Sequence, residues 1–378
     1  FMEKVKDNIA PRAEGIILFP QPGKGVVNGK QIHRTFPVNP TQPITAWGLI
    51  GAGIRAYDHM DGVGNRYGVH TVILEVDGEE VFRSVVDRFA YEENRYINSW
   101  THGQYMKSFI EPGNRLRMLH ASNGNRGLVE INEERPYRFV YTLSDALGNT
   151  SKVRFTVQGK NTEIHPVEHR EKYAFKWDRT NYLQEPGLEL VVPRGMLYDD
   201  VWLDYSVRAD SGDVAFTYQL HNKRVPLHGA CEMRIGLRRD RLEDKSKYYV
   251  AGVTARGGKY SIGGTYEDGF MKVRIRDLGT YTVAVDTVPP EIIPLNPGQW
   301  GRTGRITLKA KDKETGINSY RGTIDGKYAL FGKPNSISGN LVCELDPKHG
   351  KKGGRHTVEM TVTDGRGNRT TEEFHFVW

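Results

Sequence analysis

The strongest constraint on the fold of this chain is an internal repeat, in which one ordered set of short motifs occurs twice. The first copy opens at residues 7–11 (Asp-Asn-Ile-Ala-Pro) and the second at residues 286–290 (Asp-Thr-Val-Pro-Pro). Each opening is followed by a basic-Ala-x-Asp segment, at residues 55–58 and 309–312, and then by an Asp-Gly pair. Sequence repeats indicate repeated structural units, so we expect two related modules.

Both copies close on Asp-x-x-Gly-Asn and an alternating strand, at residues 145–149 and 364–368. The closing motif begins 134 positions after the last proline of the opening in the first copy and 74 positions after it in the second, a difference of 60 residues. The shared motifs place these extra residues before Ala56 and between Glu79 and Tyr137. The first copy therefore carries long insertions, and the second is the compact version.

Short segments with alternating apolar and polar residues recur along the chain, for example at 137–143, 152–157 and 356–362. Residues 69–76 form another β-rich run, which ends at Asp77-Gly78, a typical hairpin turn. Alternation places apolar side chains on one face of a strand, which suits β-sandwiches. The sequence therefore predicts an all-β protein.

We expect three tandem β-sandwich modules. The first, residues 1–159, is immunoglobulin-like with long insertions, and the third, residues 286–378, is a compact immunoglobulin-like module. Residues 160–285 lack the repeated motifs and have their own β-rich runs, which indicates a distinct middle β-sandwich. A chain of 378 residues is long enough to bury several separate cores.

Charge and composition exclude some classes of function. The net charge is +7 and the isoelectric point is near 9.1, but no zinc-finger, helix-turn-helix or RNP-type motif accompanies the basic residues. We therefore expect a solvated basic surface and no nucleic-acid partner. No apolar run is long enough to span a bilayer. Cys231 and Cys343 are interpreted as two small buried hydrophobic residues.

The common catalytic motifs are missing. There is no Gly-x-Ser-x-Gly, His-x-His or His-Glu-x-x-His pattern. His165 and His169 have ligand-like spacing, but Pro166 argues against a helix that would present both rings, and the segment is expected to be a solvated linker. The sequence thus predicts no catalytic, cofactor-binding or metal-binding residue. Residues 58–65 are rich in oxygen ligands and glycine, as calcium loops are, yet they lack the EF-hand spacing, and turn chemistry explains them equally well; a structural calcium there is left open.

The best candidate for a ligand-binding surface lies in the insertion of the first module, where aromatic side chains alternate with polar ones over residues 87–105. Such platforms suit contact with glycans or peptides. The alternative is that Phe89, Tyr91, Tyr96 and Trp100 cover an enlarged core beneath the insertion, an alternative we slightly favour. The candidate surface residues are Arg95, Tyr96, Asn98, Trp100, His102 and Tyr105.

The first module also contains distinctive runs at residues 51–58 (Gly-Ala-Gly-Ile-Arg-Ala-Tyr-Asp), 64–69, 87–89, 95–98 and 111–116. With these runs the chain resembles the region that follows the catalytic domain in lysostaphin-type (LytM-like) zinc endopeptidases of Gram-negative envelopes. In that family the last strand of the peptidase domain leads into a segment like residues 5–12.

The resemblance implies an exported protein, periplasmic or envelope-associated, that works on peptidoglycan. The zinc site of the family uses a His-x-x-x-Asp pair and a His-x-His pair, and neither occurs in this sequence. Zinc is therefore expected only in an upstream domain, and no catalytic residue of the family can be assigned here.

These observations predict a non-catalytic accessory region that spaces or orients an upstream peptidase domain, its expected partner, with cell-wall peptides or glycans as further partners. One alternative is an independent envelope adhesin or glycan- or peptide-binding protein, which a solvent-accessible aromatic strip around Trp100 and Tyr105 would support. Another is an enzyme with a site between modules, which clustered carboxylates or a bound metal would support.

Overall fold

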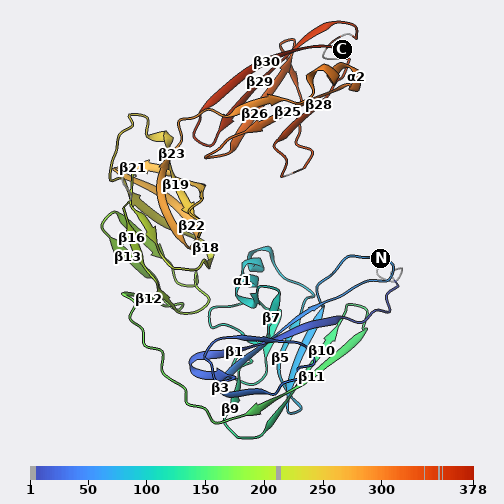
Figure 1. Ribbon diagram of the computed structural model, residues 1–378, viewed down its shortest axis with the longest axis vertical. Coiled ribbons are helices and arrows are strands. Elements are labelled where there is room, and N and C mark those ends of the chain that lie inside the picture. The colour runs from blue at the N-terminus through green and yellow to red at the C-terminus, as the bar shows by residue number, and fades with distance from the viewer. Residues whose placement is uncertain (1–5, 210–213, 336, 348–349, 351) are drawn as a thin grey trace. The chain divides into compact units, whose positions relative to one another are not determined.

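The computed structural model describes residues 6–209, 214–335, 337–347, 350 and 352–378 (Figure 1). Residues 1–5, with which the predicted first module and the segment 5–12 begin, lie outside the described part. Strands account for 52% of the chain and helices for 5%, so the predicted all-β class is confirmed. In the described part, no helix is long and apolar enough to cross a membrane.

The chain divides into two compact units, which are described separately. The first comprises residues 1–179 and 194–202, and the second comprises residues 180–193 and 203–378.

In the first unit, eleven of the described strands join into one hydrogen-bonded sheet, with β2, β1, β3, β11, β10, β4, β5 and β8 in that order. Strands β7 and β9 also pair with β3, and β6 pairs with β7. The strands are β1 (Arg12–Val27), β2 (Arg34–Phe36), β3 (Ile44–Tyr57), β4 (Thr71–Val76), β5 (Glu79–Val85), β6 (Thr101–His102), β7 (Tyr105–Lys107), β8 (Leu119–Ala121), β9 (Val129–Ile131), β10 (Pro136–Ser144) and β11 (Thr150–Gly159).

This sheet folds over a single core. Strand β3 pairs antiparallel with β1 and parallel with β11, so hydrogen bonds connect what would otherwise be two separate layers. Ile16 and Ile54 from one side of the sheet and Leu74 and Tyr141 from the other are completely buried in the same apolar cluster. The predicted alternation of β10 is confirmed, because Tyr137, Phe139, Tyr141 and Leu143 all point into this core.

The extra residues of the first copy form the long arms of β1 and β3 and a segment with two short helices, η2 (Tyr91–Tyr96) and α1 (Ile97–Trp100), which leads into β6 to β9. Trp100 anchors this segment, because its side chain is only 7% exposed and its indole Nε1 donates to the carbonyl of Lys107 at 3.0 Å.

The described part of residues 173–285 contains two five-stranded sheets, which belong to the second unit, and one two-stranded sheet, which lies almost entirely in the first (Figure 1). One large sheet has the order β13-β14-β18-β22-β21 and the other the order β16-β17-β23-β19-β20, while β12 pairs with β15. The elements are β12 (Tyr173–Phe175), β13 (Asn181–Glu185), β14 (Leu188–Val192), β15 (Val201–Leu203), β16 (Ser206–Arg208), β17 (Thr217–Gln219), β18 (Val225–Gly236), η3 (Lys245–Lys247), β19 (Tyr248–Val253), β20 (Lys259–Gly263), β21 (Thr265–Glu267), β22 (Phe270–Leu278) and β23 (Thr280–Val285).

The C-terminal residues form a seven-stranded sandwich with one sheet in the order β24-β25-β28 and another in the order β27-β26-β29-β30. Trp300 is 2% exposed at the centre of its core, and its indole Nε1 donates to the carbonyl of Leu295 at 2.8 Å. The elements are β24 (Glu291–Pro294), η4 (Pro297–Gln299), α2 (Trp300–Thr303), β25 (Arg305–Lys311), β26 (Ile317–Ile324), β27 (Lys327–Ala329), β28 (Asn340–Glu344), β29 (Arg355–Asp364) and β30 (Arg369–Val377).

The Asp-Gly turns of the repeat occupy the same place in both copies. Asp77 joins β4 to β5 with a φ of 54°, and Asp325 joins β26 to β27 with a φ of 48°. Aspartate tolerates this left-handed conformation better than most residues, and the glycine that follows adopts a positive φ as well. The predicted hairpin after residue 76 is confirmed.

The remaining sequence motifs also meet in space. One carboxylate oxygen from each of Asp7, Asp58 and Asp145 lies within 4.8 Å of the other two. The corresponding oxygens of the second copy, from Asp286, Asp312 and Asp364, lie equally close to one another. Motifs separated by more than a hundred residues in the first copy therefore form one compact cluster.

The closing asparagine ties each cluster to the opening of its copy. The Nδ2 amide of Asn149 donates to Asp145 at 2.7 Å and to the carbonyl of Asp7 at 2.9 Å. Asn368 makes the equivalent bonds, to Asp364 at 2.7 Å and to the carbonyl of Asp286 at 3.0 Å. The repeated motifs thus form the same structure in both copies, in which the closing asparagine joins the opening segment to the aspartate cluster at one end of the sandwich.

Cys231 and Cys343 are both free and buried, which confirms their interpretation as small core residues. Burial raises the pKa of each thiol to about 11.

His165 and His169 lie in an exposed segment without regular secondary structure. The ring of His169 stacks on Trp202 with 3.7 Å between centroids, whereas His165 approaches Glu163 at 3.5 Å. The two rings have different neighbours, as a linker segment predicts.

Candidate functional site

The structure separates the six predicted surface residues of the first module into different environments. Trp100 packs in the core cluster, in agreement with the core alternative for this residue, and its role in a ligand surface stays a prediction. Phe89 and Tyr91, by contrast, are 43% and 91% exposed and do not cover the core.

Arg95 and Tyr96 contact another segment of the chain. The hydroxyl of Tyr198, a residue that is 5% exposed, donates to the carbonyl of Arg95 at 2.6 Å. The rings of Tyr96 and Tyr198 lie edge to face with 5.9 Å between centroids. Leu197 and Tyr198 also pack so closely on Gly113 that a Cβ at this glycine would lie 2.4 Å from the carbonyl oxygen of Leu197. This part of the insertion therefore binds residues 194–202.

The other three residues lie nearer to solvent. Asn98 is exposed, and its Nδ2 donates to the carbonyl of Arg95 at 2.9 Å. The exposed ring of His102 lies 4.6 Å from that of His33, and the half-buried ring of Tyr105 lies 5.7 Å from the guanidinium carbon of Arg55. The exposed residues of the prediction therefore do not share one platform with Trp100, and a ligand surface formed by them stays a prediction.

A second candidate site lies on the open face of the sheet β16-β17-β23-β19-β20. Ser206 of β16 pairs with Gln219 of β17, Gln219 with Thr280 of β23, and Thr280 with Val253 of β19. Directly paired residues of antiparallel strands point to the same face. The next residues along β17 and β23, Tyr218 and Tyr281, are 1% exposed and face the core. The row from Ser206 to Val253 consequently lies on the outer face.

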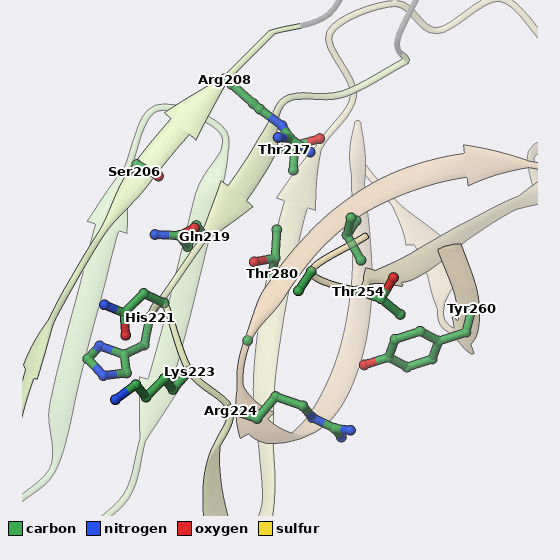
Figure 2. A pocket seen from close by; sticks show the side chains of 14 residues that line it. Ser206, Arg208, Thr217, Gln219, His221, Lys223, Arg224, Thr254, Tyr260 and Thr280 are labelled. Atoms are coloured by element: carbon green, nitrogen blue, oxygen red, sulfur yellow. The ribbon is translucent and has the colours of Figure 1, made fainter. Parts of the chain in front are cut away.

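This face is hollowed into a groove of about 520 Å³, a volume in the range of small-ligand sites. In the described part of the chain, its lining consists mainly of hydroxyl, amide and basic side chains and includes no carboxylate (Figure 2). Figure 2 shows the lining residues, which come from the strands β16, β17, β19, β20 and β23 and from the segments that connect them to their neighbours. We call this feature the polar groove; its polar and charged side chains are Ser206, Arg208, Thr217, Gln219, His221, Asn222, Lys223, Arg224, Thr254, Tyr260 and Thr280.

An aromatic ring bounds the groove on one side. Tyr260 of β20 is 37% exposed and stands opposite Gly252 of β19. A Cβ at Gly252 would lie only 2.3 Å from the ring, so glycine is required for the tyrosine to lie flat on the neighbouring strand. Packed in this way on Gly252, the tyrosine contributes an aromatic side chain to the lining of the groove.

At the end of the groove away from Tyr260, hydrogen bonds to the backbone of Asp204 hold the side chains of His221 and Gln219. The amide of Asp204 donates to Nδ1 of His221 at 3.1 Å, and Nε2 of Gln219 donates to the carbonyl of Asp204 at 3.0 Å. The same short segment therefore positions both side chains.

Charge in the groove is positive. Arg224 is paired with Asp277 at 2.5 Å, and this hydrogen bond is the main reason why the pKa of Arg224 is raised. Arg208, which is exposed, and Lys223 add further positive charge, and the lining residues that the structure describes include no carboxylate. The groove can donate hydrogen bonds to hydroxyls and attract anionic groups.

The sequence did not predict this site. Its residues come from five segments between 206 and 280 and form no motif of fixed spacing. One signal was present in the sequence. Ser206 and Arg208 are two positions apart, as are Thr217 and Gln219, so each polar pair lies on one face of its short strand. Without the register of the strands, that alternation does not identify a shared surface.

Comparison with known proteins links the middle of the chain to a described family. Residues 172–286 match the model of the Zu5-like domain. The match spans the strands β12 to β23 and thus the whole polar groove. No protein of curated function matches the sequence.

Several solved structures are similar at low identity. A surface glycan-binding protein of Bacteroides ovatus, SGBP-B from a mixed-linkage glucan utilization locus, is 10% identical, with 98% of this chain and 71% of that chain covered and a TM-score of 0.15. A Ca²⁺-stabilized ice-binding adhesin of an Antarctic bacterium is 11% identical over 95% of this chain and 99% of that one, with a TM-score of 0.16. The human desmocollin-1 ectodomain is 12% identical over 86% of this chain and 64% of that one, with a TM-score of 0.18. The fold assignment rests on the sheets described above.

Proposed function

We propose that this chain is a non-catalytic, exported β-sandwich region that binds an acidic glycan in its polar groove. The observation that carries the proposal is the composition of that groove, in which three basic side chains and several hydroxyl and amide groups surround a ligand-sized volume, with no carboxylate among the described lining residues. Sugars present many hydroxyls that need donors and acceptors, and acidic sugars add negative charge that Arg208 and Lys223 complement.

The aromatic ring supports the glycan class over a simple anion. A phosphate or sulfate ion needs only basic and amide donors, whereas a sugar ring also presents an apolar face that stacks on aromatic side chains. Tyr260 provides such a ring at the edge of the groove, held by its close packing on Gly252.

The accessory role beside an upstream peptidase domain is compatible with this function and is itself a proposal, based on the family resemblance of the first module. In that case the groove would hold cell-wall polymer near the peptidase. An adhesin would use the same groove on a surface glycan of another cell, so the binding proposal does not depend on which of the two parent proteins is correct.

Binding can be tested by affinity electrophoresis of the purified chain in gels that contain polygalacturonate, an acidic polysaccharide, or mixed-linkage β-glucan, a neutral one. We expect retardation in the acidic gel that weakens as salt is added. Arg208→Glu should weaken binding about 10-fold, since one lost and reversed charge contact is worth about 1.4 kcal/mol or more.

The control is Arg369→Glu, which makes the same charge change at an exposed position on β30, outside the groove. If Arg369→Glu weakens binding as much as Arg208→Glu does, the net charge of the chain and not the groove is responsible. If neither polysaccharide retards the chain, the acidic-glycan proposal is wrong.

A further inference from the structure

The three aspartates of the first copy form a cluster whose charge is incompletely compensated. Asp7, Asp58 and Asp145 each place a carboxylate oxygen within 4.8 Å of the other two. Like charges at this distance repel strongly where water is scarce, so donors or a counter-ion must compensate them.

Two of the aspartates have donors from the backbone. Oδ1 of Asp145 accepts the amides of Leu147 and Asn149, each at 2.8 Å, and its Oδ2 accepts the side-chain amide of Asn149. Oδ1 of Asp7 accepts the amide of Ile9 at 3.0 Å. These bonds supply donors to Asp145 and Asp7 but none to Oδ1 of Asp58.

Asp58 is different. Its side chain is 7% exposed, and its Oδ1 is a buried oxygen without a hydrogen-bond partner among the described residues. Burial raises the pKa of Asp58, the amide of His59 opposes this shift, and the neighbouring Asp145 and Asp7 raise the pKa further. A buried carboxylate oxygen with no donor is unfavourable unless something outside the chain completes its coordination.

The cluster opens into a cavity with room for such a group. The cavity has a volume of about 680 Å³, and the three aspartates form part of its lining. The other walls are mainly apolar, among them Met60, Trp100 and Leu147. A group that enters this cavity therefore meets negative oxygen ligands at one place and apolar side chains elsewhere.

We propose that Asp7, Asp58 and Asp145 bind a divalent cation of the calcium type. Two oxygens that coordinate one Ca²⁺ at 2.3–2.6 Å are at most about 5 Å apart, so carboxylate oxygens within 4.8 Å of one another fit a shared ion. The ion would join the opening segment of the copy, the end of β3 and the loop between β10 and β11. Water would complete the coordination from the cavity.

This site differs from a calcium loop formed by residues 58–65 alone. Asp61 accepts a hydrogen bond from Nδ2 of Asn8 at 3.0 Å, and the carbonyl of Asn65 contacts Nδ1 of His59 at 2.9 Å. Of that segment, only Asp58 belongs to the cluster. The proposed ligands are the repeated aspartates, which the sequence places far apart.

The C-terminal copy is an internal control because its cluster is already compensated. Oδ2 of Asp312 accepts three backbone amides, from Glu314 at 3.1 Å and from Thr315 and Gly316 at 2.7 Å. The hydroxyl of Thr315 donates to Oδ2 of Asp286 at 2.6 Å. We therefore propose no cation for this copy.

Terbium luminescence tests the proposal, because Tb³⁺ occupies calcium sites and is sensitised by nearby aromatic residues. Trp100 and Tyr67 line the same cavity as the aspartates. Titration of the chain with Tb³⁺ should give one saturable luminescent site, which CaCl₂ displaces. Asp58→Asn should weaken this binding at least about 10-fold, since it removes one of three charged ligands. Asp312→Asn, the matched change in the other copy, should leave it unchanged.

Hydrogen exchange provides a second measurement that does not depend on luminescence. Addition of CaCl₂ after EDTA should slow the exchange of amides in residues 145–149 of the wild-type chain and leave residues 364–368 unaffected. Asp7→Asn, at a half-buried position, should remove the slowing as Asp58→Asn does.

The rival explanation is that Asp58 is protonated and shares its proton with a neighbouring aspartate. In that case Tb³⁺ binds Asp58→Asn and wild type alike, and CaCl₂ does not change the exchange of residues 145–149. Either result overturns the proposal. Binding that Asp312→Asn weakens as much as Asp58→Asn does would overturn it too, since the ion would then not be specific to the first copy.

Discussion

The two copies of the repeat use the same aspartates in different ways. In the C-terminal copy, residues 312–316 form a tight loop whose amides turn back to Asp312. In the first copy, the chain after Asp58 continues through a longer loop and returns as a bridge with Tyr67, so no amide of this kind reaches Oδ1 of Asp58. Loop length therefore decides whether the same carboxylate is closed by the backbone or left for a ligand.

The closing motifs differ as well. Arg366 of the C-terminal copy donates from one guanidinium nitrogen to the carbonyls of Tyr248 and Gly264, both at 3.0 Å, and its own carbonyl accepts from Lys247 at 3.0 Å. Leu147 holds the equivalent position in the first copy, is 42% exposed and lines the cavity beside the aspartates. The same end of the sandwich is an intramolecular junction in one copy and an open cavity in the other.

The largest effect should come from the aspartate that closes each copy. Asp364 is 1% exposed and accepts the amides of Arg366 and Asn368 and the side chain of Asn368. Asp364→Ala should reduce the stability of the C-terminal sandwich by about 4 kcal/mol, because three charge-assisted hydrogen bonds are lost and their donors remain buried. Hydrogen exchange of β30 amides measures the loss.

Asp145→Ala is the matched change in the first copy. It should be milder in EDTA, about 2 kcal/mol, because the loss of three hydrogen bonds is offset by relief of the repulsion on Asp58. Equal losses for the two variants would show that the clusters do not differ in charge compensation.

The next largest effect concerns the junction. Arg366→Ala should weaken the coupling between residues 203–285 and the C-terminal sandwich by about 2 kcal/mol, because two hydrogen bonds from a charged donor are lost at a half-buried position. We expect the unfolding transitions of the two regions to separate in urea. Arg369→Ala, at an exposed position nearby, should leave them together.

The third comparison is between Asp312 and Asp58, whose removal should affect stability differently. Asp312→Ala should destabilise its copy by about 2 kcal/mol, since three backbone amides lose their acceptor. Asp58→Ala in EDTA should leave stability unchanged or raise it, because it removes a buried oxygen that has no donor. Urea denaturation followed by exchange of β3 and β25 amides measures both, and a large loss for Asp58→Ala in EDTA would contradict the description of its cluster.

Local patterns in the sequence predicted the strands, whereas the sites depend on long-range register. The alternation at residues 137–143 and the turn at Asp77 are properties of a few neighbouring residues, so the sequence alone is sufficient for them. The polar groove requires Ser206, Gln219 and Thr280 to be paired across three strands, and no local signal specifies that pairing.

The aspartate cluster could be predicted in part from the sequence. The repeat identified Asp7, Asp58 and Asp145 as related to Asp286, Asp312 and Asp364, but the sequence did not show that each set converges. For Trp100 the local pattern was misleading. An aromatic residue among polar neighbours suggested a surface, but the hydrogen bond from its indole to the carbonyl of Lys107 shows that it anchors the insertion to the core.

The smallest expected effect concerns the Asp-Gly turns, which differ in the partner of the aspartate. Asp325 accepts from Nδ1 of His356 at 2.7 Å, and this bond is the main cause of its lowered pKa. Burial alone would raise the pKa of Asp77, but the amide of Arg138 and the guanidinium of Arg135 outweigh it and lower the pKa. A folded-state pKa below the unfolded value means that each carboxylate stabilises the fold above the unfolded value, and that this contribution is lost as the pH falls through the folded value.

Asp77→Asn and Asp325→Asn should therefore each reduce stability by less than about 1 kcal/mol at pH 7, because the side chains of both aspartates are a third or more exposed to solvent, and neither substitution should matter below about pH 3. Exchange of β27 and β5 amides at about pH 3 and at about pH 7 makes the measurement. An effect of equal size at the two pH values, for either variant, would mean that the charge of that aspartate does not stabilise its turn.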